Sequence, residues 1–431
     1  MRVQLKTLGC RLNEAELETW AREFQSAGYQ VVDEKEEADL LVLNSCAVTQ
    51  DAVRKSRGLI RKIGRENPKA KVILSGCYAT LDPEEAQTLG VDLVVDNQDK
   101  HRLVELARQR LPPEIMPSLA TDPDHSVLFR LGRHRAFIKV QDGCRYRCTY
   151  CIVTVARGDE RSRSINEIIA EVRAFEKQGI GEIILTGVHL GGYGSDSGST
   201  LRHLVERVLA ETQIPRIRLG SLEPWDIPDD FVALFENPRL MPHLHLPLQS
   251  GSDAVLKRMA RRTRREDFLS LIDRFRKAVP EINITSDIIV GFPGETQDEW
   301  EETLELVETV GFGGLHIFSY SPRPGTAAAL MPNRIPGNIQ SERSRELHAI
   351  AEKQKRASLN HLVGQQRRVL WEGKKTLNGK HLIMGYTPEY HRVGVWVSDS
   401  VAESLPYTIK LTTLKAFDEE NDCLVGEISH E

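Results

Sequence analysis

Three of the chain's seven cysteines lie in one short segment and could bind a metal centre together. The segment reads Cys144-Arg-Tyr-Arg-Cys148-Thr-Tyr-Cys151, so three and two residues separate its thiols. Structural zinc sites usually have four protein ligands, and no fourth Cys or His is obvious near this segment. Three thiolates instead suit a cubane iron-sulfur cluster with one iron left open. An open iron can chelate a small ligand and pass it one electron.

A second set of three cysteines is spread over the N-terminal part of the chain. Cys10, Cys46 and Cys77 each follow a predicted strand by one to three residues. Parallel strands bring their carboxyl ends to one edge of a sheet, where open α/β folds place their sites. We therefore expect these thiols to meet, the alternative being three unrelated buried cysteines. The seventh, Cys423, is predicted to be a surface or strand thiol without a ligand role.

Length and composition indicate a folded protein of several domains. The 431 residues suggest about three domains at roughly 150 residues each. The 57 Lys and Arg residues against 62 Asp and Glu residues give a net charge of -5, so any nucleic-acid partner must be met by local patches. An odd cysteine count does not fit a fully paired secreted framework. Charges near the N-terminus and the lack of a long apolar run predict a cytoplasmic protein without a membrane partner.

Hydrophobic patterning predicts an α/β protein in three parts. In residues 1–112, strands are expected at 3–8, 38–43, 71–74 and 91–95, and helices at 14–27, 51–65 and 82–89. This alternation predicts βαβ units and a parallel sheet. A weakly patterned connection at 111–124 contains proline and leads to the second part.

The second part, residues 125–345, carries six further strand and helix units. The strands are expected at 137–140, 182–185, 216–219, 243–247, 284–290 and 315–318, and the helices at 165–178, 201–210, 254–261, 265–278 and 299–310. Six such units predict a complete or partial (β/α) barrel, with sites at the carboxyl ends of its strands. A polar helix at 341–360 precedes residues 362–431, where short strand patterns at 368–371, 391–397, 407–411 and 424–428 predict a small antiparallel barrel.

The cysteine segments carry a resemblance to the methylthiotransferase family of radical S-adenosylmethionine (radical SAM) enzymes. The CxxxCxxC spacing resembles the radical SAM motif, and Thr-Leu-Gly-Cys10-Arg-Leu-Asn-Glu, Leu-Asn-Ser-Cys46-Ala-Val-Thr and Ser-Gly-Cys77-Tyr-Ala are similar to the family's three N-terminal motifs. Further matches are Val-Gln-Asp-Gly-Cys144, Ala-Arg157-Gly158, Leu-Gln249-Ser250-Gly251-Ser, Val-Gly291-Phe-Pro293-Gly294-Glu295-Thr and the Gly385-Tyr386-Thr phrase of a TRAM domain. One departure is Ile-Val-Thr-Val after Cys151, where the family usually has Ile-Ile-Pro-Tyr.

This resemblance implies a fold and a set of cofactors. The expected parts are a Rossmann-like N-terminal methylthiotransferase domain, a radical SAM barrel and a TRAM barrel. It implies that Cys144, Cys148 and Cys151 hold a catalytic 4Fe-4S cluster, which cleaves S-adenosylmethionine. Cys10, Cys46 and Cys77 would hold an auxiliary 4Fe-4S cluster that carries sulfur. Contacts to S-adenosylmethionine are expected from the cluster loop and the strand ends, at Tyr150, Thr186, Gly187, His189, Ser221, Glu223, Gln249, Ser250 and Asp287.

The resemblance also implies a reaction and partners. The motif sequences look most like those of one branch of the family. That branch adds a methylthio group to C2 of N6-threonylcarbamoyladenosine at position 37 of tRNA, near the anticodon. Other branches act on isopentenyladenosine or on an aspartate of a ribosomal protein. A reductase or flavodoxin-type electron donor and a sulfur donor are further expected partners. A zinc-bearing RNA-binding protein without catalysis is the non-enzymatic alternative.

Local basic and aromatic groups are candidates for contacts to the anticodon stem-loop. The candidate phosphate contacts are Arg261, Arg262, Arg264, Arg265, Arg367, Arg368, Lys374, Lys375 and Lys380. Tyr386, Tyr390 and His391 are expected on the same RNA-facing surface, since aromatic rings stack on unpaired bases. Trp371 and Trp396 are predicted to be core residues.

Overall fold

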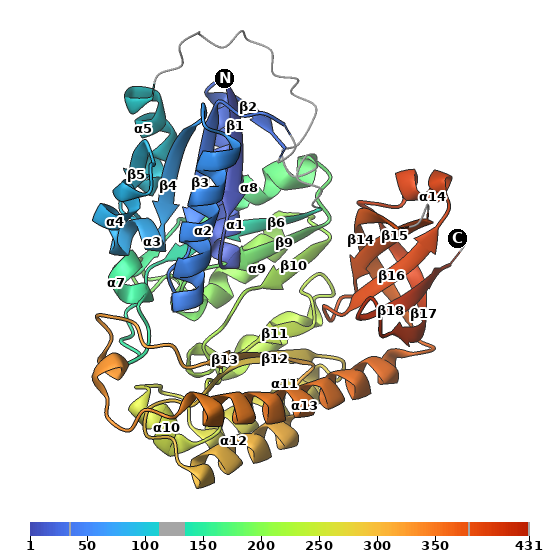
Figure 1. Cartoon of the computed structure of the whole chain (residues 1–431). Helices are drawn as coiled ribbons and strands as arrows, with labels where there is room; N and C mark the ends of the chain where they lie inside the picture. Colours follow the sequence, from blue (N-terminus) through green and yellow to red (C-terminus); the bar gives the residue numbers. More distant parts are fainter. Residues whose placement is uncertain (34–35, 112–133, 378–379, 430–431) are drawn as a thin grey trace.

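The N-terminal part of the chain forms a five-stranded parallel sheet (Figure 1). The computed structural model describes residues 1–33, 36–111, 134–377 and 380–429. Along the sheet the strand order is β2 (Gln30–Val32), β1 (Arg2–Thr7), β3 (Leu40–Ser45), β4 (Lys71–Gly76) and β5 (Leu93–Val95). The helices are α1 (Arg11–Ser26), α2 (Gln50–Glu66), α3 (Cys77–Leu81), α4 (Pro83–Thr88) and α5 (Leu103–Arg110), with a 3₁₀ turn η1 (Lys100–Arg102). The parallel sheet expected from the sequence is confirmed.

The central strand β3 shows why this sheet is covered on both faces. All six of its residues are buried, as in a parallel strand between two helical layers. Leu40 and Val42 belong to the core that contains Trp20 of α1, whereas Leu41 and Leu43 belong to the core on the other face, with α2. The carboxyl ends of β1, β3 and β4 therefore emerge at one edge between the two helical layers.

The middle of the chain forms a partial barrel of six parallel strands. Two three-stranded sheets have the orders β6 (Arg135–Lys139), β9 (Glu182–Thr186), β10 (Arg216–Leu219) and β11 (His243–His245), β12 (Asn283–Val290), β13 (Gly314–Ser319). Bridges between Ile217 and Leu240 and between Ser221 and His245 join the two sheets in parallel. In the described part of the chain β6 and β13 do not pair, so the barrel is partial rather than complete.

Amphipathic helices cover the outside of the partial barrel. These are α8 (Ile165–Lys177), α9 (Leu201–Glu211), α11 (Arg265–Ala278) and α12 (Gln297–Val310). α12 begins at a capping box between Thr296 and Glu299 and ends at Gly311, which has a φ of 61°. Shorter elements are β7 (Gln141–Asp142), α7 (Val153–Arg157), β8 (Arg161–Ser162), η2 (Leu190–Gly192), η3 (Pro224–Asp226), η4 (Asp229–Glu236), α10 (Asp253–Arg258) and η5 (Ala327–Leu330).

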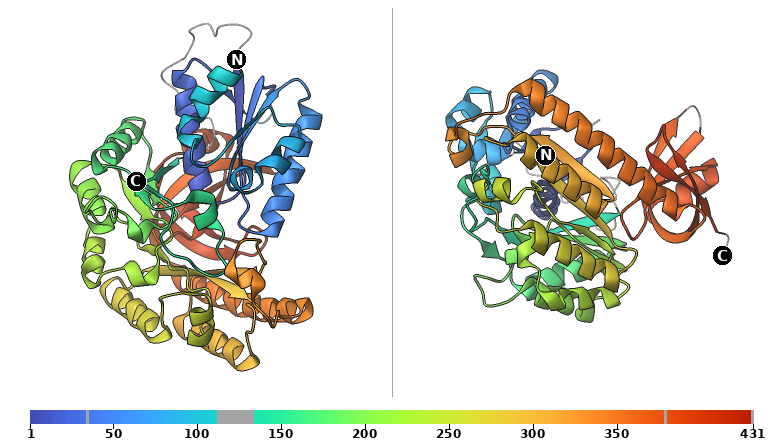
Figure 2. Two further views of the ribbon diagram at one scale, coloured as in Figure 1. Left: turned by 90° about the vertical axis from the view of Figure 1, so that its left-hand side faces the viewer. Right: turned by 90° about the horizontal axis from the view of Figure 1, so that it is seen from below.

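A long helix leads to a closed C-terminal barrel. α13 (Gly337–Leu362) runs beneath the partial barrel and reaches the C-terminal barrel, which projects to one side (Figures 1 and 2). The C-terminal strands are β14 (Gln366–Leu377), β15 (Lys380–Tyr386), β16 (Arg392–Val397), β17 (Ile409–Asp418) and β18 (Cys423–Ile428), with α14 (Asp399–Ser404). The strand order is β14-β15-β16-β18-β17, and only the β16 and β18 pair is parallel in this otherwise antiparallel barrel.

The C-terminal barrel confirms one predicted core tryptophan and corrects the other. Trp371 is fully buried, but the side chain of Trp396 is 43% exposed. On β16 the side chains alternate between faces, and Val393 and Val395 already occupy the inward positions. Trp396 therefore points outward. Cys423 is a strand thiol as predicted, but it is buried rather than at the surface.

Helix α1 joins the N-terminal sheet to the partial barrel. Ala15 of α1 packs with Phe137 of β6 and Ile184 of β9. The carboxylate of Glu18 accepts a hydrogen bond from the backbone N–H of Phe137 at 3.0 Å. As a result, the carboxyl edge of the N-terminal sheet faces the interior of the partial barrel.

Most predicted elements are present, and several observed elements were not predicted. Each strand expected in the first two parts overlaps an observed strand, and β10 coincides with its predicted range. β2, α5 and β15 had no predicted counterpart. The expected connection at 111–124 lies outside the described residues apart from its first residue. In the described residues no helix is long and apolar enough to cross a membrane.

Candidate active site

One cavity of about 740 Å³ holds both cysteine trios. It lies between the carboxyl edge of the N-terminal sheet and the interior of the partial barrel. Its walls include Cys10, Cys46, Cys77, Cys144, Cys148 and Cys151. Its volume is within the range of sites for small molecules and cofactors. Two sets of residues that are far apart in sequence therefore face the same space.

The ends of three parallel strands assemble the N-terminal trio. Cys46 directly follows β3 and Cys77 directly follows β4, while Cys10 follows β1 after a short turn. Gly76 has a φ of 96°, and a side chain there would meet the backbone oxygen of Ser45 at 2.3 Å. Glycine therefore lets β3 and β4 approach closely just before their cysteines. The expectation that the three thiols meet is confirmed by their shared cavity.

Two asparagine side chains hold the turns that carry the N-terminal trio. Asn13 donates to the backbone oxygen of Leu8 at 2.8 Å, and its own oxygen lies 3.7 Å from the sulfur of Cys10. The side-chain amide of Asn97 donates to the backbone oxygen of Ala156 at 2.8 Å and lies 3.9 Å from the sulfur of Cys77. These contacts fix the turns that carry two of the three thiols.

A single loop carries the second trio, and backbone hydrogen bonds hold that loop. The N–H of Cys144 donates to the oxygen of Gly158 at 3.1 Å, and that of Cys151 donates to the oxygen of Cys148 at 3.0 Å. Thr149 binds the end of α10 through its N–H, which donates to Met259, and through its hydroxyl, which donates to Arg258. The loop is thus attached at its two ends and at its middle.

A buried charge network connects the two trios. The guanidinium of Arg157, six residues after Cys151, contacts Glu16 of α1 and Asp142 of β7, each at 3.0 Å. It also donates to the side-chain oxygen of Asn13 at 3.0 Å. Burial alone would raise the pKa of Glu16, but Arg157 and two nearby lysines hold that pKa well below its usual range. An ionised cluster therefore spans the junction between the sheet and the barrel.

Burial raises the pKa of cysteine thiols in both trios. Burial, reinforced by the nearby thiol of Cys77, raises the pKa of Cys46 to about 11. Burial and the neighbouring thiols of Cys151 and Cys148 raise the pKa of Cys144 to about 12. Ligation of a metal centre by these residues must therefore release protons.

The donor sets fit a three-cysteine cluster better than a closed zinc site. The most obvious fourth ligand near the loop trio is His189, whose ring lies near Cys144 and Glu160. Both ring nitrogens of His189 are already engaged, one with Glu160 and one with Asp226. Burial alone would lower the pKa of His189, but these bonds to Asp226 and Glu160 raise it. Both ring nitrogens are thus directed at carboxylates.

Seven of the nine predicted cofactor contacts line the cavity. They are Tyr150, Thr186, Gly187, Ser221, Glu223, Gln249 and Asp287. The other two, His189 and Ser250, do not line it. Both are buried, and the hydroxyl of Ser250 lies 3.2 Å from that of Thr303. Gln249 has a φ of 77°, a strained conformation for a residue with a side chain, as is often found at functional sites.

His245, His316 and Arg11 line the cavity but had no role in the sequence prediction. Asp287 lies between two imidazoles, 3.2 Å from His245 and 3.0 Å from His316. Arg11 and Tyr390 also reach the cavity. His245 and His316 lie on predicted strands, which is the only signal that sequence reading offered. Arg11 stands beside Cys10 in the motif, but its role depends on contacts that only the fold creates.

The C-terminal barrel contributes the floor of the cavity. Tyr390, from the loop between β15 and β16, accepts a hydrogen bond from Arg135 of β6 at 2.9 Å. The rings of Tyr386 and Tyr390 stack with centroids 4.9 Å apart, and Arg135 lies 4.3 Å from the centre of Tyr386. Both tyrosines are half-buried at the junction with the partial barrel, and the RNA-facing role expected of them stays a prediction.

Among the predicted phosphate contacts, Arg261 is corrected because it is buried, and Arg265 stays a prediction. Arg261 is only 8% exposed and forms an ion pair with Glu223 at 2.7 Å. Arg265 forms an ion pair with Glu305 at 2.7 Å. Arg262, Arg264, Arg368 and Lys374 are exposed as expected. The side chains of Lys375 and Lys380 lie outside the described part of the structure.

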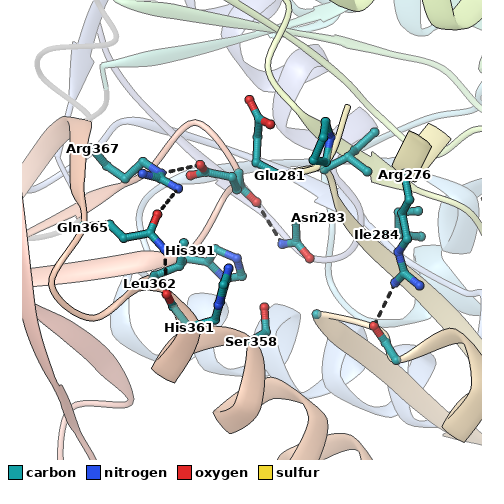
Figure 3. A pocket seen from close by; sticks show the side chains of 15 residues that line it. Arg276, Glu281, Asn283, Ile284, Ser358, His361, Leu362, Gln365, Arg367 and His391 are labelled. Atoms are coloured by element: carbon teal, nitrogen blue, oxygen red, sulfur yellow. Dashed lines mark hydrogen bonds and ion pairs between the residues drawn. The ribbon is translucent and has the colours of Figure 1, made fainter. Parts of the chain in front are cut away.

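Figure 3 shows a second cavity, of about 430 Å³, where α11, α13 and the loop between β15 and β16 meet. Arg367 and His391, both predicted to face RNA, lie in its wall. Arg367 is held by Glu389 at 2.6 Å and by Gln365 at 2.7 Å, as the dashed lines show. His391 is buried. These two side chains therefore support the junction of the barrels.

Family models match two parts of the chain. Residues 138–307 match the radical SAM superfamily, and residues 2–96 match the uncharacterized protein family UPF0004. The first match contains the loop trio, and the second contains the N-terminal trio.

Two kinds of tRNA-modifying relative resemble the chain. It is 39% identical over 411 residues to the threonylcarbamoyladenosine tRNA methylthiotransferase MtaB of Thermotoga maritima, with 93% of this chain and 92% of that protein covered. It is 35% identical to the MtaB of Bacillus subtilis, with coverages of 96% and 94%. It is also 38% identical to the tRNA-2-methylthio-N(6)-dimethylallyladenosine synthase of Jannaschia sp., with coverages of 85% and 83%.

Solved structures share the fold at low sequence identity. The radical S-adenosylmethionine methyltransferase TsrM from Kitasatospora setae superimposes with a TM-score of 0.58 at 15% identity, over 76% of this chain and 75% of that one. The cobalamin-dependent S-adenosylmethionine radical enzyme OxsB gives a TM-score of 0.51 at 15% identity, over 82% and 56%. At such identities the likeness concerns the fold alone.

Proposed function

We propose that this chain, which belongs to the methylthiotransferase family of radical SAM enzymes, adds a methylthio group to C2 of N6-threonylcarbamoyladenosine in tRNA. The observation that carries the proposal is the single cavity lined by two sets of three cysteines. The names of the Thermotoga and Bacillus relatives support the acceptor. Because the Jannaschia relative is almost as similar, the dimethylallyl acceptor is the second candidate.

Each cysteine trio would hold one 4Fe-4S cluster. Cys144, Cys148 and Cys151 would hold the cluster that binds S-adenosylmethionine, and Cys10, Cys46 and Cys77 the auxiliary one. When bound, these groups supply the radical chemistry and the sulfur needed to functionalise an unactivated C–H bond, which no side chain can deprotonate. The sequence-based extents of the parts, 1–112, 125–345 and 362–431, are proposed as the three domains.

The chain's own residues would bind and orient the cofactor and shelter the reaction. Tyr150 lies between two cluster cysteines in the loop and borders the cavity, where its ring can pack against an adenine. Thr186, Gly187, Ser221 and Gln249 stand at or just beyond the strand ends, where backbone and side-chain groups can meet the cofactor's amino acid part. Arg261, neutralised by Glu223, is positioned beside them.

The RNA would reach the cavity with help from the C-terminal barrel. Exposed cations on β14, Arg368 and Lys374, are available for phosphate contacts. We further propose an electron donor of the reductase or flavodoxin type, a separate sulfur donor, and a cytoplasmic location, where the tRNA substrate is found.

Anaerobic reconstitution followed by iron analysis tests the two-cluster proposal. We expect about eight iron and about eight labile sulfide per chain, because each trio suits one 4Fe-4S cluster. Replacing Cys144, Cys148 and Cys151 by Ala should halve both values, and so should replacing the N-terminal trio. The matched control is Cys423→Ala, since this thiol is buried in β18 and should leave the iron content unchanged. Binding of only four iron by the unaltered chain would contradict the proposal, and stoichiometric zinc would favour the non-enzymatic alternative.

Nucleoside mass spectrometry of tRNA tests the acceptor. Tracking the methylthio forms of both nucleosides in a deletion strain should show loss of 2-methylthio-N6-threonylcarbamoyladenosine alone. Loss of the methylthio dimethylallyl form instead would support the second candidate. An unchanged profile of both nucleosides would refute a tRNA acceptor and direct attention to a protein substrate.

A further inference from the structure

We propose that Arg11 recognises the carboxylate of the threonylcarbamoyl group and so selects this nucleoside over apolar N6-modified adenosines. The inference rests on the proposed function, because it concerns the substituent that distinguishes the two candidate acceptors. A threonylcarbamoyl group carries a carboxylate, whereas a dimethylallyl group is a hydrocarbon. A site that holds a carboxylate needs an open cation or hydrogen-bond donors.

The other arginines of the cavity are already neutralised. Arg157 is in contact with Glu16 and Asp142, each at 3.0 Å. Arg261 is in contact with Glu223 at 2.7 Å. Arg11 also lines the cavity, and within the described ranges no carboxylate lies within ion-pair distance of its guanidinium. Among the described residues of this wall, Arg11 is therefore the arginine whose charge no carboxylate balances.

Arg11 is positioned at the junction of all three parts of the chain. It is the first residue of α1 and follows Cys10, so its side chain leaves the backbone beside the N-terminal trio. Its guanidinium donates to the hydroxyl of Tyr390 at 3.3 Å and lies 5.2 Å from the centre of that ring. Tyr390 is in turn held by Arg135 at 2.9 Å. The hydroxyl and the ring of Tyr390 hold one edge of the Arg11 guanidinium. The other N–H groups of the guanidinium remain available to a ligand.

The buried imidazole of His243 lies close to the tyrosine that Arg11 contacts. It is only 2% exposed and lines the same cavity. Its Nε2 lies 3.2 Å from the hydroxyl of Thr285, but its buried Nδ1 has no hydrogen-bond partner. Its ring lies 5.0 Å from that of Tyr390, so His243 and Arg11 border the same part of the cavity.

The surroundings of Arg11 favour an anion. Arg135 forms an ion pair with Glu372, and Arg218 forms one with Glu182, so one carboxylate balances the charge of each arginine. The guanidinium of Arg218 also lies 4.4 Å from the centre of the Tyr390 ring. Within the described residues, Arg11 is the one arginine of this group that has no carboxylate at ion-pair distance, so no side chain compensates its charge. A ligand carboxylate would balance it, whereas a hydrocarbon would leave Arg11 without a counter-charge.

The test compares two anticodon stem-loop RNAs that differ in one group. One carries N6-threonylcarbamoyladenosine, and the other carries the same nucleoside with its carboxylate converted to the neutral amide. On the reconstituted holoenzyme, the unaltered chain should bind and convert the acid roughly 10- to 100-fold better than the amide, the range expected of a charge-assisted hydrogen bond. In Arg11→Gln this preference should collapse to about 1- to 3-fold, and Arg11→Lys should restore part of it. Arg54→Gln, on the exposed face of α2, is the matched control and should keep the full preference.

The outcomes separate this inference from the proposed function. Methylthiolation of the acid RNA by the unaltered chain, with the preference intact in Arg11→Gln, overturns the role of Arg11 and leaves the proposed function standing. Failure of the unaltered chain to modify the acid RNA contradicts the proposed function itself. An equal loss for both RNAs in Arg11→Gln would show a phosphate or folding role. A selective loss of S-adenosylmethionine binding would assign Arg11 to the cofactor; either result overturns the inference.

Discussion

The two cysteine trios reach the same cavity by opposite routes. One loop after β6 supplies Cys144, Cys148 and Cys151, and short backbone bonds hold that loop. The other trio exists only when β1, β3 and β4 lie side by side. A locally encoded site keeps its spacing in a partly folded chain, whereas a fold-encoded site appears only with the sheet. The difference predicts different responses to mutation.

The largest expected effect comes from the network that joins the two trios. Arg157→Ala leaves Glu16 and Asp142 buried with less compensation, so we expect a loss of about 3–5 kcal/mol in the free energy of unfolding. Urea denaturation of the reconstituted protein measures it. Iron at both trios should fall, because the arginine supports both. The exposed Arg54→Ala should change stability by less than about 0.5 kcal/mol. A loss below about 1 kcal/mol in Arg157→Ala would show that the two sites are independent.

A smaller effect should separate the trios. A side chain at Gly143 would meet the backbone oxygen of Asp159 at 1.9 Å, and one at Gly76 would meet Ser45 at 2.3 Å. Gly143→Ala should therefore lower iron at the loop trio alone, and Gly76→Ala at the N-terminal trio alone, each with a loss of roughly 2–4 kcal/mol in stability. Iron is measured in chains whose other trio is replaced by alanines.

The control for these glycines lies in the same loop region. Gly158 has a φ of 73°, close to the 74° of Gly143, but a side chain there would have open space around it. Gly158→Ala should therefore cost only about 1–2 kcal/mol, the backbone part of the effect. If Gly158→Ala and Gly143→Ala removed equal amounts of iron, the close approach to Asp159 would not matter.

The smallest expected effect is a pH dependence of stability caused by His391, which lies outside both trios. Burial lowers the pKa of His391 to about 4, whereas an unfolded chain binds the proton near 6.5. Above pH 6.5 this histidine is neutral in both states and contributes nothing to the pH dependence. As the pH falls from 6.5 toward 4, stability should decrease, by about 1–2 kcal/mol at pH 5. Comparing denaturation of the unaltered chain and His391→Gln at pH 7.5 and 5 isolates the effect. An identical pH dependence in the two proteins would contradict it.

The same contrast between local and fold-dependent features explains which predictions the sequence allowed. The loop trio and β10 were predictable because spacing and apolar pattern are local properties. The meeting of Cys10, Cys46 and Cys77 needed one further rule, that parallel strands end at one edge. The burial of Arg261 was not predictable, because its partner Glu223 lies on a different loop of the barrel. The contacts of Tyr390 were not predictable for the same reason, since the arginines around it come from β6, β10 and α1.

The position of Tyr390 has a consequence for how such chains can be rearranged. A C-terminal barrel attached only by α13 would be an exchangeable accessory, open to replacement by any RNA-binding unit. Here its loop forms part of the reaction chamber, and its stacked tyrosines lie against charges from the two other parts. Truncation after α13 would therefore leave a chamber without a floor. Replacing the C-terminal barrel by a unit without this loop would therefore also remove Tyr390 from the cavity wall.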